Sequence, residues 1–323
     1  MASNNPSAGV IDLGGTKIYS AVVGADGSVR GEDLRPTYAA AGQAAVIDAM
    51  MESLQAAASD AKLELGRLCG VGVAAPGPVN AARGNLTNPP NLPGWGDVPL
   101  GTILSGRLSL PVVIENDANA AAMGEYLEGA GQGARALIFV TVSTGIGGGI
   151  VLDGDLYRGP DGTAGELGHM IVQPGGPRCG CGSQGCLEAV ASGTALARDG
   201  QAAIDSGGAP VLARLTAREG GEASAELVAQ AASLGDAAAA ALLTRAGEML
   251  GIGLGNLVNL LNPDVIAIGG GVAKIGSPLL GPAEATMRKV AFPLPGARVR
   301  LRPAELQYPA LHGLVGLVRA ATA

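Results

Sequence analysis

The stretch that decides the fold runs from residue 9 to residue 23 and reads GVIDLGGTKIYSAVV. Two β-rich apolar runs, residues 9–13 and 18–23, flank a pair of glycines, and Asp26-Gly27 provides the next turn. Short apolar runs separated by such turns are typical of antiparallel strands. Further on, residues 44–58 place apolar side chains at helical spacing, and residues 70–75 form another apolar run. The order is therefore hairpin, third strand, helix and strand.

The same order returns in the second half of the chain. Residues 136–142 are apolar, the glycine turn Ser143-Thr-Gly-Ile-Gly-Gly-Gly149 follows, and Asp153-Gly154 marks a later turn. Far downstream, a helical stretch around residues 237–261 leads into an apolar run at residues 264–268 that ends in glycines. The repeat is one of layout and not of identity, and it predicts two similar α/β domains that face each other.

A domain boundary is expected near residue 117. Residues 111–115 read as a strand and residues 118–128 as an Ala-rich helix, while residues 310–321 have helical apolar spacing and are expected to pack back on the first domain. We therefore predict a small α/β domain of residues 1–117 plus about 308–323, and a large α/β domain of residues 118–307. Residues 88–99, with four prolines and the only tryptophan, form an irregular loop long enough to line a pocket.

Composition excludes several classes of protein. The chain has 323 residues, of which 47% are hydrophobic and 15% charged, which excludes an extended disordered chain. The net charge of −7 and the absence of a Lys/Arg run argue against a general nucleic-acid or anionic-membrane surface. The first eight residues lack a signal-peptide pattern, and the apolar stretch at residues 250–261 is too short to span a bilayer. The expected compartment is the cytoplasm.

The strongest local signal is a set of metal-ligand residues. His169, Cys179, Cys181 and Cys186 follow the spacing H-x9-C-x-C-x4-C. Three thiolates and one imidazole form a closed tetrahedral set that suits structural Zn²⁺, so residues 169–186 are predicted to be a zinc-binding segment. The alternative is three small buried residues beside an unrelated histidine. The fourth cysteine, Cys69, is expected to be a buried core thiol in a strand.

The glycine turns are candidate anion sites. In the first turn, Gly14 and Gly15 would let backbone N–H groups approach a phosphate, Thr16 adds a hydroxyl, and Asp12 could hold a hydrated Mg²⁺. The alternative for this turn alone is a hairpin with a nearby acid, but the second glycine turn occupies the matching place in the second unit. A third glycine run, residues 269–271, ends an apolar strand, where it could border an adenine or ribose or allow close helix–strand packing.

Carboxylates and one histidine are candidates for the chemistry itself. Asp117 follows an apolar strand and precedes a helix, so it is either an N-cap or a general base at the carboxyl end of a strand, or both. Glu166, His169 and Glu188 lie close together in the sequence, around the predicted zinc segment. They are either acceptors for sugar hydroxyls or ordinary solvated carboxylates beside a metal ligand.

Taken together, these motifs resemble the ROK family of sugar kinases and repressors, and within it the bacterial glucokinases. The resemblance covers nearly the whole chain. The motifs that carry it are Asp12-Leu-Gly-Gly-Thr-Lys17, Glu115-Asn-Asp-Ala-Asn119, Ser143-Thr-Gly-Ile-Gly-Gly-Gly149, Glu166-Leu-Gly-His169, Cys179-Gly-Cys-Gly-Ser-Gln-Gly-Cys-Leu-Glu188 and Ile268-Gly-Gly-Gly-Val272. The resemblance implies a two-lobed actin-like ATPase fold, ribonuclease-H-like in each lobe, with the active site in the cleft between the domains.

The resemblance also implies a reaction and its residues. A glucokinase transfers the γ-phosphoryl group of ATP to the 6-hydroxyl of glucose, and Asp117 would be the general base. The other sugar hydroxyls would be held by Asn91, Asn116, Glu166, His169 and Glu188. The phosphates of ATP would lie on Gly14, Gly15, Thr16, Lys17, Thr144 and Gly145. Gly270 and Gly271 would border the adenosine, and Asp12 would act on Mg²⁺ through water.

Other activities in the same family stay open at this point. The substrate could be another hexose or an N-acetylhexosamine, and a polyphosphate donor is a further alternative. A sugar-sensing DNA-binding regulator would carry a helix-turn-helix domain in front, and only nine residues precede Val10, so we expect none. The expected partners are glucose and ATP, without nucleic acid or membrane, in a homodimer or homotetramer.

Overall fold

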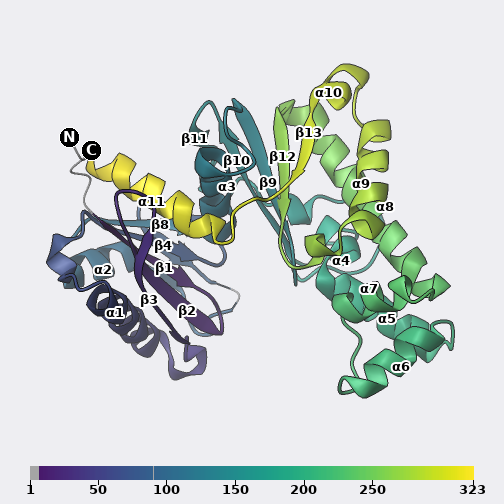
Figure 1. Cartoon of the computed structure of the whole chain (residues 1–323), viewed down its shortest axis with the longest axis horizontal. Helices are drawn as coiled ribbons and strands as arrows, with labels where there is room; N and C mark the ends of the chain where they lie inside the picture. The colour runs from purple at the N-terminus through teal and green to yellow at the C-terminus, as the bar shows by residue number, and fades with distance from the viewer. Residues whose placement is uncertain (1–6, 90) are drawn as a thin grey trace.

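The computed structural model describes residues 7–89 and 91–323 and has two lobes, each built on a five-stranded sheet (Figure 1). The sheet of the small lobe has the order β3-β2-β1-β4-β8. Its strands are β1 (Ala8–Leu13), β2 (Lys17–Val23), β3 (Val29–Pro36), β4 (Val71–Ala75) and β8 (Val112–Asn116). β1 pairs antiparallel with β2 and parallel with β4, and β4 pairs parallel with β8.

The sheet of the large lobe repeats this topology in the order β11-β10-β9-β12-β13. Its strands are β9 (Ala136–Val142), β10 (Ile146–Leu152), β11 (Asp155–Leu156), β12 (Val265–Gly269) and β13 (Arg300–Pro303). β9 pairs antiparallel with β10 and parallel with β12, as β1 pairs with β2 and β4. The predicted repeat of layout is therefore confirmed, and with it the two-lobed, ribonuclease-H-like fold.

Apolar helix faces build the core of each lobe. In the small lobe, α1 (Gln43–Asp60) buries the predicted residues Val46, Ile47, Met50 and Leu54. In the large lobe, α8 (Ala237–Leu261) begins after Asp236, whose carboxylate accepts hydrogen bonds from two backbone N–H groups of the first turn. α8 packs against α9 (Ser277–Val290), and its apolar side chains join the main core cluster of the lobe.

α8 also corrects the expectation for residues 250–261. That stretch is the second half of a 25-residue helix, which among the described residues is the one helix long and apolar enough to cross a membrane. Leu250, Leu254 and Leu257 are buried in the protein core. The length and apolar composition of α8 are therefore explained by its packing in the core of the large lobe.

Two helices lie where the lobes meet. α3 (Asp117–Glu128) packs on β9 and β10 of the large lobe, and α11 (Pro309–Thr322) packs on α3. The chain returns to the small lobe through α11, which lies against β1 and β4, as the yellow helix over the purple sheet in Figure 1 shows. The exact domain boundaries at residues 117 and 308 stay a prediction.

The remaining elements are short or peripheral. A three-stranded sheet in the small lobe contains β5 (Val79–Asn80), β6 (Asn85–Thr87) and β7 (Asp97–Val98). The other helices are α2 (Leu100–Leu108), α4 (Leu187–Ala191), α5 (Gly193–Asp205), α6 (Pro210–Arg218), α7 (Ala225–Ser233) and α10 (Pro293–Arg298). The 3₁₀ turns are η1 (Ala39–Ala41), η2 (Leu65–Arg67), η3 (Leu167–His169) and η4 (Val272–Ile275).

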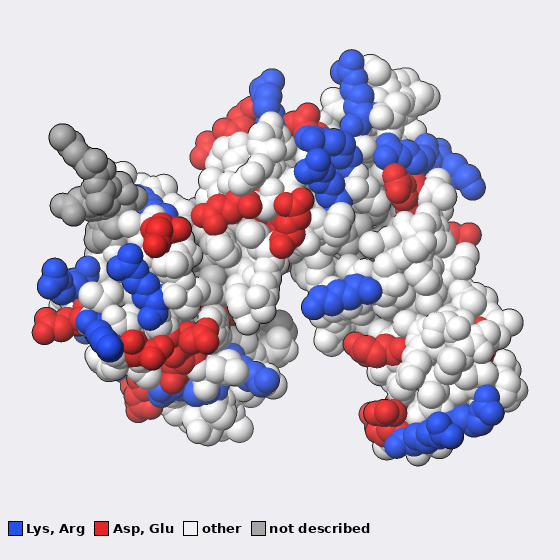
Figure 2. Space-filling model, in the orientation of Figure 1, with Lys and Arg blue, Asp and Glu red and all other residues white. Residues whose placement is uncertain are grey.

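Two smaller expectations need adjustment. Residues 88–99 are not wholly irregular, because they contain the strand β7 and the buried Trp95, while Pro90 lies outside the described residues. Cys69 was expected in a strand, but it lies in the bend before β4 and is half-buried. On the face drawn in Figure 2, basic and acidic side chains are interspersed and form no continuous basic surface.

Candidate active site

A cavity of about 480 Å³ lies between the lobes and is lined from both of them. It brings together all six residues predicted to contact a sugar, and these are Asn91, Asn116, Asp117, Glu166, His169 and Glu188. Thr144 and Gly145 of the second glycine turn line the same cavity. Polar side chains from distant parts of the sequence therefore surround one space next to a candidate phosphate site.

Asp117 is placed by the junction of β8 and α3. It is the first residue of α3, so it is not the N-cap, and the expected cap role belongs to Asn116 instead. The Asn116 Oδ1 atom accepts hydrogen bonds from the N–H groups of Ala118 and Asn119 at 2.9 and 3.1 Å. Because the neighbouring residue caps the helix, the Asp117 side chain is available to the cavity that it lines.

The Asn116 side chain is already largely engaged. Besides the two bonds that its oxygen accepts, its amide nitrogen donates to the carbonyl of Gly77 at 3.2 Å. Binding of a sugar hydroxyl by Asn116 stays a prediction. In this structure Asn116 caps α3 and holds the end of β8, directly before Asp117.

Asp117 and Asp12, which lies on β1, both have raised pKa values. Asp117 lines the open cavity, yet protein atoms surround it on most sides, and this partial removal from water raises its pKa, as does the charge of Glu166. The N–H of Ala118 opposes the shift with a hydrogen bond of 2.7 Å. Burial, assisted by the charge of Asp117, raises the pKa of Asp12 to about 6. The ends of β1 and β8 therefore bring two acids into electrostatic contact.

The first glycine turn lies directly beside the sugar cavity. The N–H of Gly14 donates to the carbonyl of Lys17 at 2.9 Å, and the buried Thr37 hydroxyl donates to the carbonyl of Gly14 at 2.6 Å. A Cβ atom at Gly15 would lie only 2.6 Å from the Cβ of Asn91. The loop that carries Asn91 thus contacts the turn that is predicted to hold phosphate.

The second glycine turn is tied to a predicted sugar contact. The Glu188 Oε2 atom accepts a hydrogen bond of 3.0 Å from the N–H of Ile146, next to Gly145. On the other side, Thr194 at the start of α5 donates its N–H and its hydroxyl to the carbonyl of Thr144, at 3.2 and 2.9 Å. The turn is therefore held in place from both sides.

The third glycine run lines a second cavity of about 570 Å³ that also reaches Asp117. Gly270 and Gly271 form part of its wall, and Lys274, Glu305 and Gln307 contribute polar side chains that belong to none of the sequence motifs. Asp117 borders both cavities, so a ligand in each could meet at this carboxylate. The first cavity likewise contains residues that were missed, among them Thr141 and the Gly162–Gly165 segment, and the glycine spacing of that segment was the available signal.

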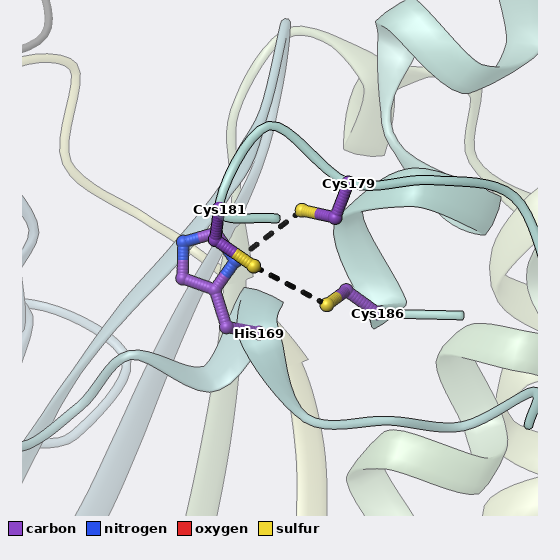
Figure 3. A group of neighbouring side chains, drawn as sticks. All are labelled: His169, Cys179, Cys181 and Cys186. Atoms are coloured by element: carbon purple, nitrogen blue, oxygen red, sulfur yellow. Dashed lines mark hydrogen bonds between the residues drawn. The ribbon is translucent and has the colours of Figure 1, made fainter. Parts of the chain in front are cut away.

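The predicted metal ligands form one cluster (Figure 3). Their four ligand atoms all lie within 4.8 Å of one another. The His169 Nδ1 atom is 3.6 Å from the Cys179 Sγ, and the Cys181 and Cys186 Sγ atoms are 3.7 Å apart. A tetrahedral Zn²⁺ with ordinary bond lengths would separate a nitrogen and a sulfur ligand by about 3.6 Å and two sulfurs by about 3.8 Å. The donor set and these distances fit such an ion.

The histidine of this cluster also faces the sugar cavity. Its Nδ1 atom is directed at the thiols, while its Nε2 atom lies 3.8 Å from Glu166 Oε2 at the cavity wall. Burial raises the pKa of Cys186 to about 12, so this thiol would keep its proton unless a metal replaced it. One side chain thus connects the metal cluster with the cavity.

Comparison with known proteins agrees with this geometry. The ROK family profile matches residues 8–320. The chain is 38% identical over 284 residues to a glucokinase from Halalkalibacterium halodurans, covering 88% of this chain and 86% of that protein. It is 36% identical over 272 residues to a glucokinase from Thermotoga maritima, covering 84% of each.

Solved structures show the same architecture. The crystal structure of a ROK family glucokinase from Streptomyces griseus in complex with glucose and AMPPNP matches with a TM-score of 0.81 and 34% identity, over 97% of this chain and 99% of that chain. A ROK family transcriptional regulator matches with a TM-score of 0.86 and 28% identity, over 99% of this chain and 79% of that chain. Because the profile and the relatives extend over most of the chain, this protein belongs to the ROK family.

Proposed function

We propose that this protein is an ATP-dependent glucokinase that transfers the γ-phosphoryl group of ATP to the 6-hydroxyl of glucose. The observation that carries the proposal is the cavity in which six polar side chains, Asp117 among them, surround a space beside the second glycine turn. Two relatives that match this chain over 86% and 84% of their own length are glucokinases, which supports glucose as the acceptor.

Asp117 would act as the general base. A hydroxyl attacks phosphorus more readily when a carboxylate accepts its proton in the transition state. The raised pKa of Asp117 favours this role, because a base works best when its pKa approaches the working pH. Asn91, Asn116, Glu166, His169 and Glu188 would bind the other hydroxyls and so orient the 6-hydroxyl toward the phosphate.

The glycine turns would bind ATP. The Gly14–Lys17 turn, in which the Gly14 N–H already donates to the carbonyl of Lys17, and the Thr144-Gly145 turn would hold the phosphates, with Gly270 and Gly271 beside the adenosine. Mg²⁺ would neutralise charge on the phosphates, and Asp12 would hold it through water. Closure of the two lobes on sugar would exclude water, which otherwise competes with the sugar hydroxyl as the nucleophile.

Structural Zn²⁺ is the second part of the proposal. His169, Cys179, Cys181 and Cys186 would hold the ion, which would contribute stability to the segment they share. With the Nδ1 atom of His169 on the metal, its Nε2 atom would be fixed toward the cavity. Glu188, two residues after the last cysteine, would be held in place by the same segment.

The remaining assignments complete the proposal. Glucose and ATP would be the partners, without nucleic acid or membrane, and the protein would act in the cytoplasm as a homodimer or homotetramer. The small domain would comprise residues 1–117 and about 308–323, and the large domain residues 118–307.

A coupled ADP-release assay tests the proposed function. Glucose, mannose, fructose, N-acetylglucosamine and N-acetylmannosamine are each supplied with ATP and Mg²⁺, and a sample without sugar measures hydrolysis. Glucose should give the highest kcat/KM, and ³¹P NMR of the product should show glucose 6-phosphate. A higher kcat/KM with an N-acetylhexosamine would assign another ROK kinase activity, and no sugar-dependent release would refute the kinase.

A further inference from the structure

A buried carboxylate lies next to the proposed base and belongs to no step described so far. Glu115 is the penultimate residue of β8, two positions before Asp117, and its side chain is 1% exposed. A buried carboxylate is strongly unfavourable unless hydrogen bonds and an opposite charge compensate it. The partners of Glu115 therefore show what holds this strand end in place.

Both carboxylate oxygens of Glu115 are occupied. Oε1 accepts hydrogen bonds from the N–H of Asn116 at 3.0 Å and from the side-chain amide of Asn119 at 3.1 Å. Oε2 accepts from Nε of Arg158 and forms an ion pair with its second guanidinium nitrogen, each at 2.8 Å. Arg158 supplies the compensating charge, while Asn116 and Asn119 link the carboxylate to the first turn of the helix that begins with Asp117.

Arg158 comes from the other lobe. It follows β11 of the large sheet, and the N–H of the preceding Tyr157 donates to the carbonyl of Ile150 on β10 at 2.8 Å. Its ion pair with Glu115 on β8 therefore connects the large lobe to the small lobe. The connection is made at the end of the strand that carries Asp117.

The segment after Arg158 contacts the small lobe a second time. The N–H of Ala164 donates to the carbonyl of Arg158 at 2.9 Å and closes a loop. Gly162 lies in this loop with φ of 80°, and a Cβ atom there would be 2.6 Å from the carbonyl oxygen of Val79. Gly162 to Glu166 line the sugar cavity, so the loop that Arg158 begins also forms one wall of the site.

We infer that Arg158 is a positioning residue for phosphoryl transfer, acting through Glu115 to hold Asp117 in its place between the lobes. The inference rests on the proposed function and adds a residue to it. Removal of the guanidinium would leave Glu115 buried without its cation, and the strand end would rearrange to hydrate it. A displacement of about 1 Å at a reacting group can lower the rate about 100-fold.

Arg158→Gln, Glu115→Gln and the double variant test the inference. Arg158→Gln should lower kcat about 10- to 100-fold. Because the arginine acts through Glu115, the double variant should have a kcat within about threefold of Glu115→Gln alone. Glucose affinity, followed by the fluorescence of Trp95, the only tryptophan, should change less than fivefold in all three.

Arg35→Gln is the matched control. Arg35 pairs with Asp33 at 2.7 Å on β3, with 22% of its side chain exposed against 32% for Arg158, and it lies outside both cavities. Loss of this ion pair, and of the second one that Arg35 forms with Glu52 at 3.0 Å, should change kcat less than twofold. If Arg158→Gln fails to fold, the kcat of the double variant relative to Glu115→Gln still tests the inference, because the double variant leaves no unpaired buried charge.

The inference is wrong if Arg158→Gln stays within threefold of the wild-type kcat, or if the double variant falls more than tenfold below Glu115→Gln. The proposed function is judged separately, by whether the wild type releases ADP with glucose. Ratios between variants and wild type can be measured with whichever sugar the enzyme phosphorylates.

Discussion

The replacement Asp12→Asn should stabilise the protein in the absence of Mg²⁺ while it removes activity. Asp12 has a pKa of about 6 in the folded protein and about 3.8 when unperturbed. The difference of about 2.2 pKa units, at about 1.36 kcal/mol each, corresponds to at most about 3 kcal/mol. Solvent that reaches the half-buried side chain reduces this value.

The sign of the pH dependence follows from the raised pKa. A carboxyl that binds its proton more tightly when folded favours the folded state below pH 3.8, and that contribution is lost as pH rises through 6. Asparagine does not ionise, so the variant should gain free energy of unfolding relative to the wild type between pH 4 and pH 7. The gain should be constant above pH 7.

Urea unfolding of both proteins without added Mg²⁺ at pH 4.5, 6 and 8 measures this difference. The expected gain at pH 8 is about 1 to 3 kcal/mol, with about a third of that at pH 4.5, where the unfolded carboxyl is already mostly ionised, and glucose-dependent ADP release should fall at least 100-fold. A variant that is less stable than wild type at pH 8, or a difference that does not change with pH, would refute the argument from burial beside Asp117.

Two further replacements test the other parts of the site. Cys181→Ser should lose the metal and raise the glucose KM at least tenfold more than the ATP KM, because the cluster orients His169 at the sugar cavity. Metal analysis and steady-state kinetics of the variant measure both effects. Full zinc occupancy or an unchanged glucose KM would contradict the prediction. Gly15→Ala should raise the KM values for glucose and ATP together by about 10-fold or more, since the new Cβ would displace Asn91 from the first glycine turn. A rise in the ATP KM alone would show that the Asn91 loop and this turn act independently.

The fold could be predicted from the sequence because its signals are local. Alternating apolar runs and glycine turns mark the hairpins at residues 8–23 and 136–152, and the same order in both halves indicates two lobes. The metal ligands lie within 18 residues of one another, so their spacing alone predicts the cluster in Figure 3. Glycine turns and closely spaced cysteines each determine the structure of a short segment. The hairpins and the cluster that they predict are present in the structure.

What the sequence did not reveal depends on contacts between distant segments. Asn116 and Asp117 are both good caps, and only the helix geometry shows that Asn116 has this role. Nothing in the sequence distinguishes Arg158 from other loop arginines, because its ion pair with Glu115 forms only when the two lobes come together. Lys274, Glu305 and Gln307 of the second cavity come from segments without any motif, so only the folded structure brings them together.

The central claim is that Asp117 accepts the proton of the sugar during phosphoryl transfer from ATP. The most direct measurement is kcat for glucose-dependent ADP release by wild type and Asp117→Asn in the same assay. The account predicts release by the wild type only when glucose is present, and a kcat about 10² to 10⁴ lower in the folded variant, which still binds glucose. A variant within a few-fold of wild type, or a wild type whose ADP release does not depend on sugar, would contradict it.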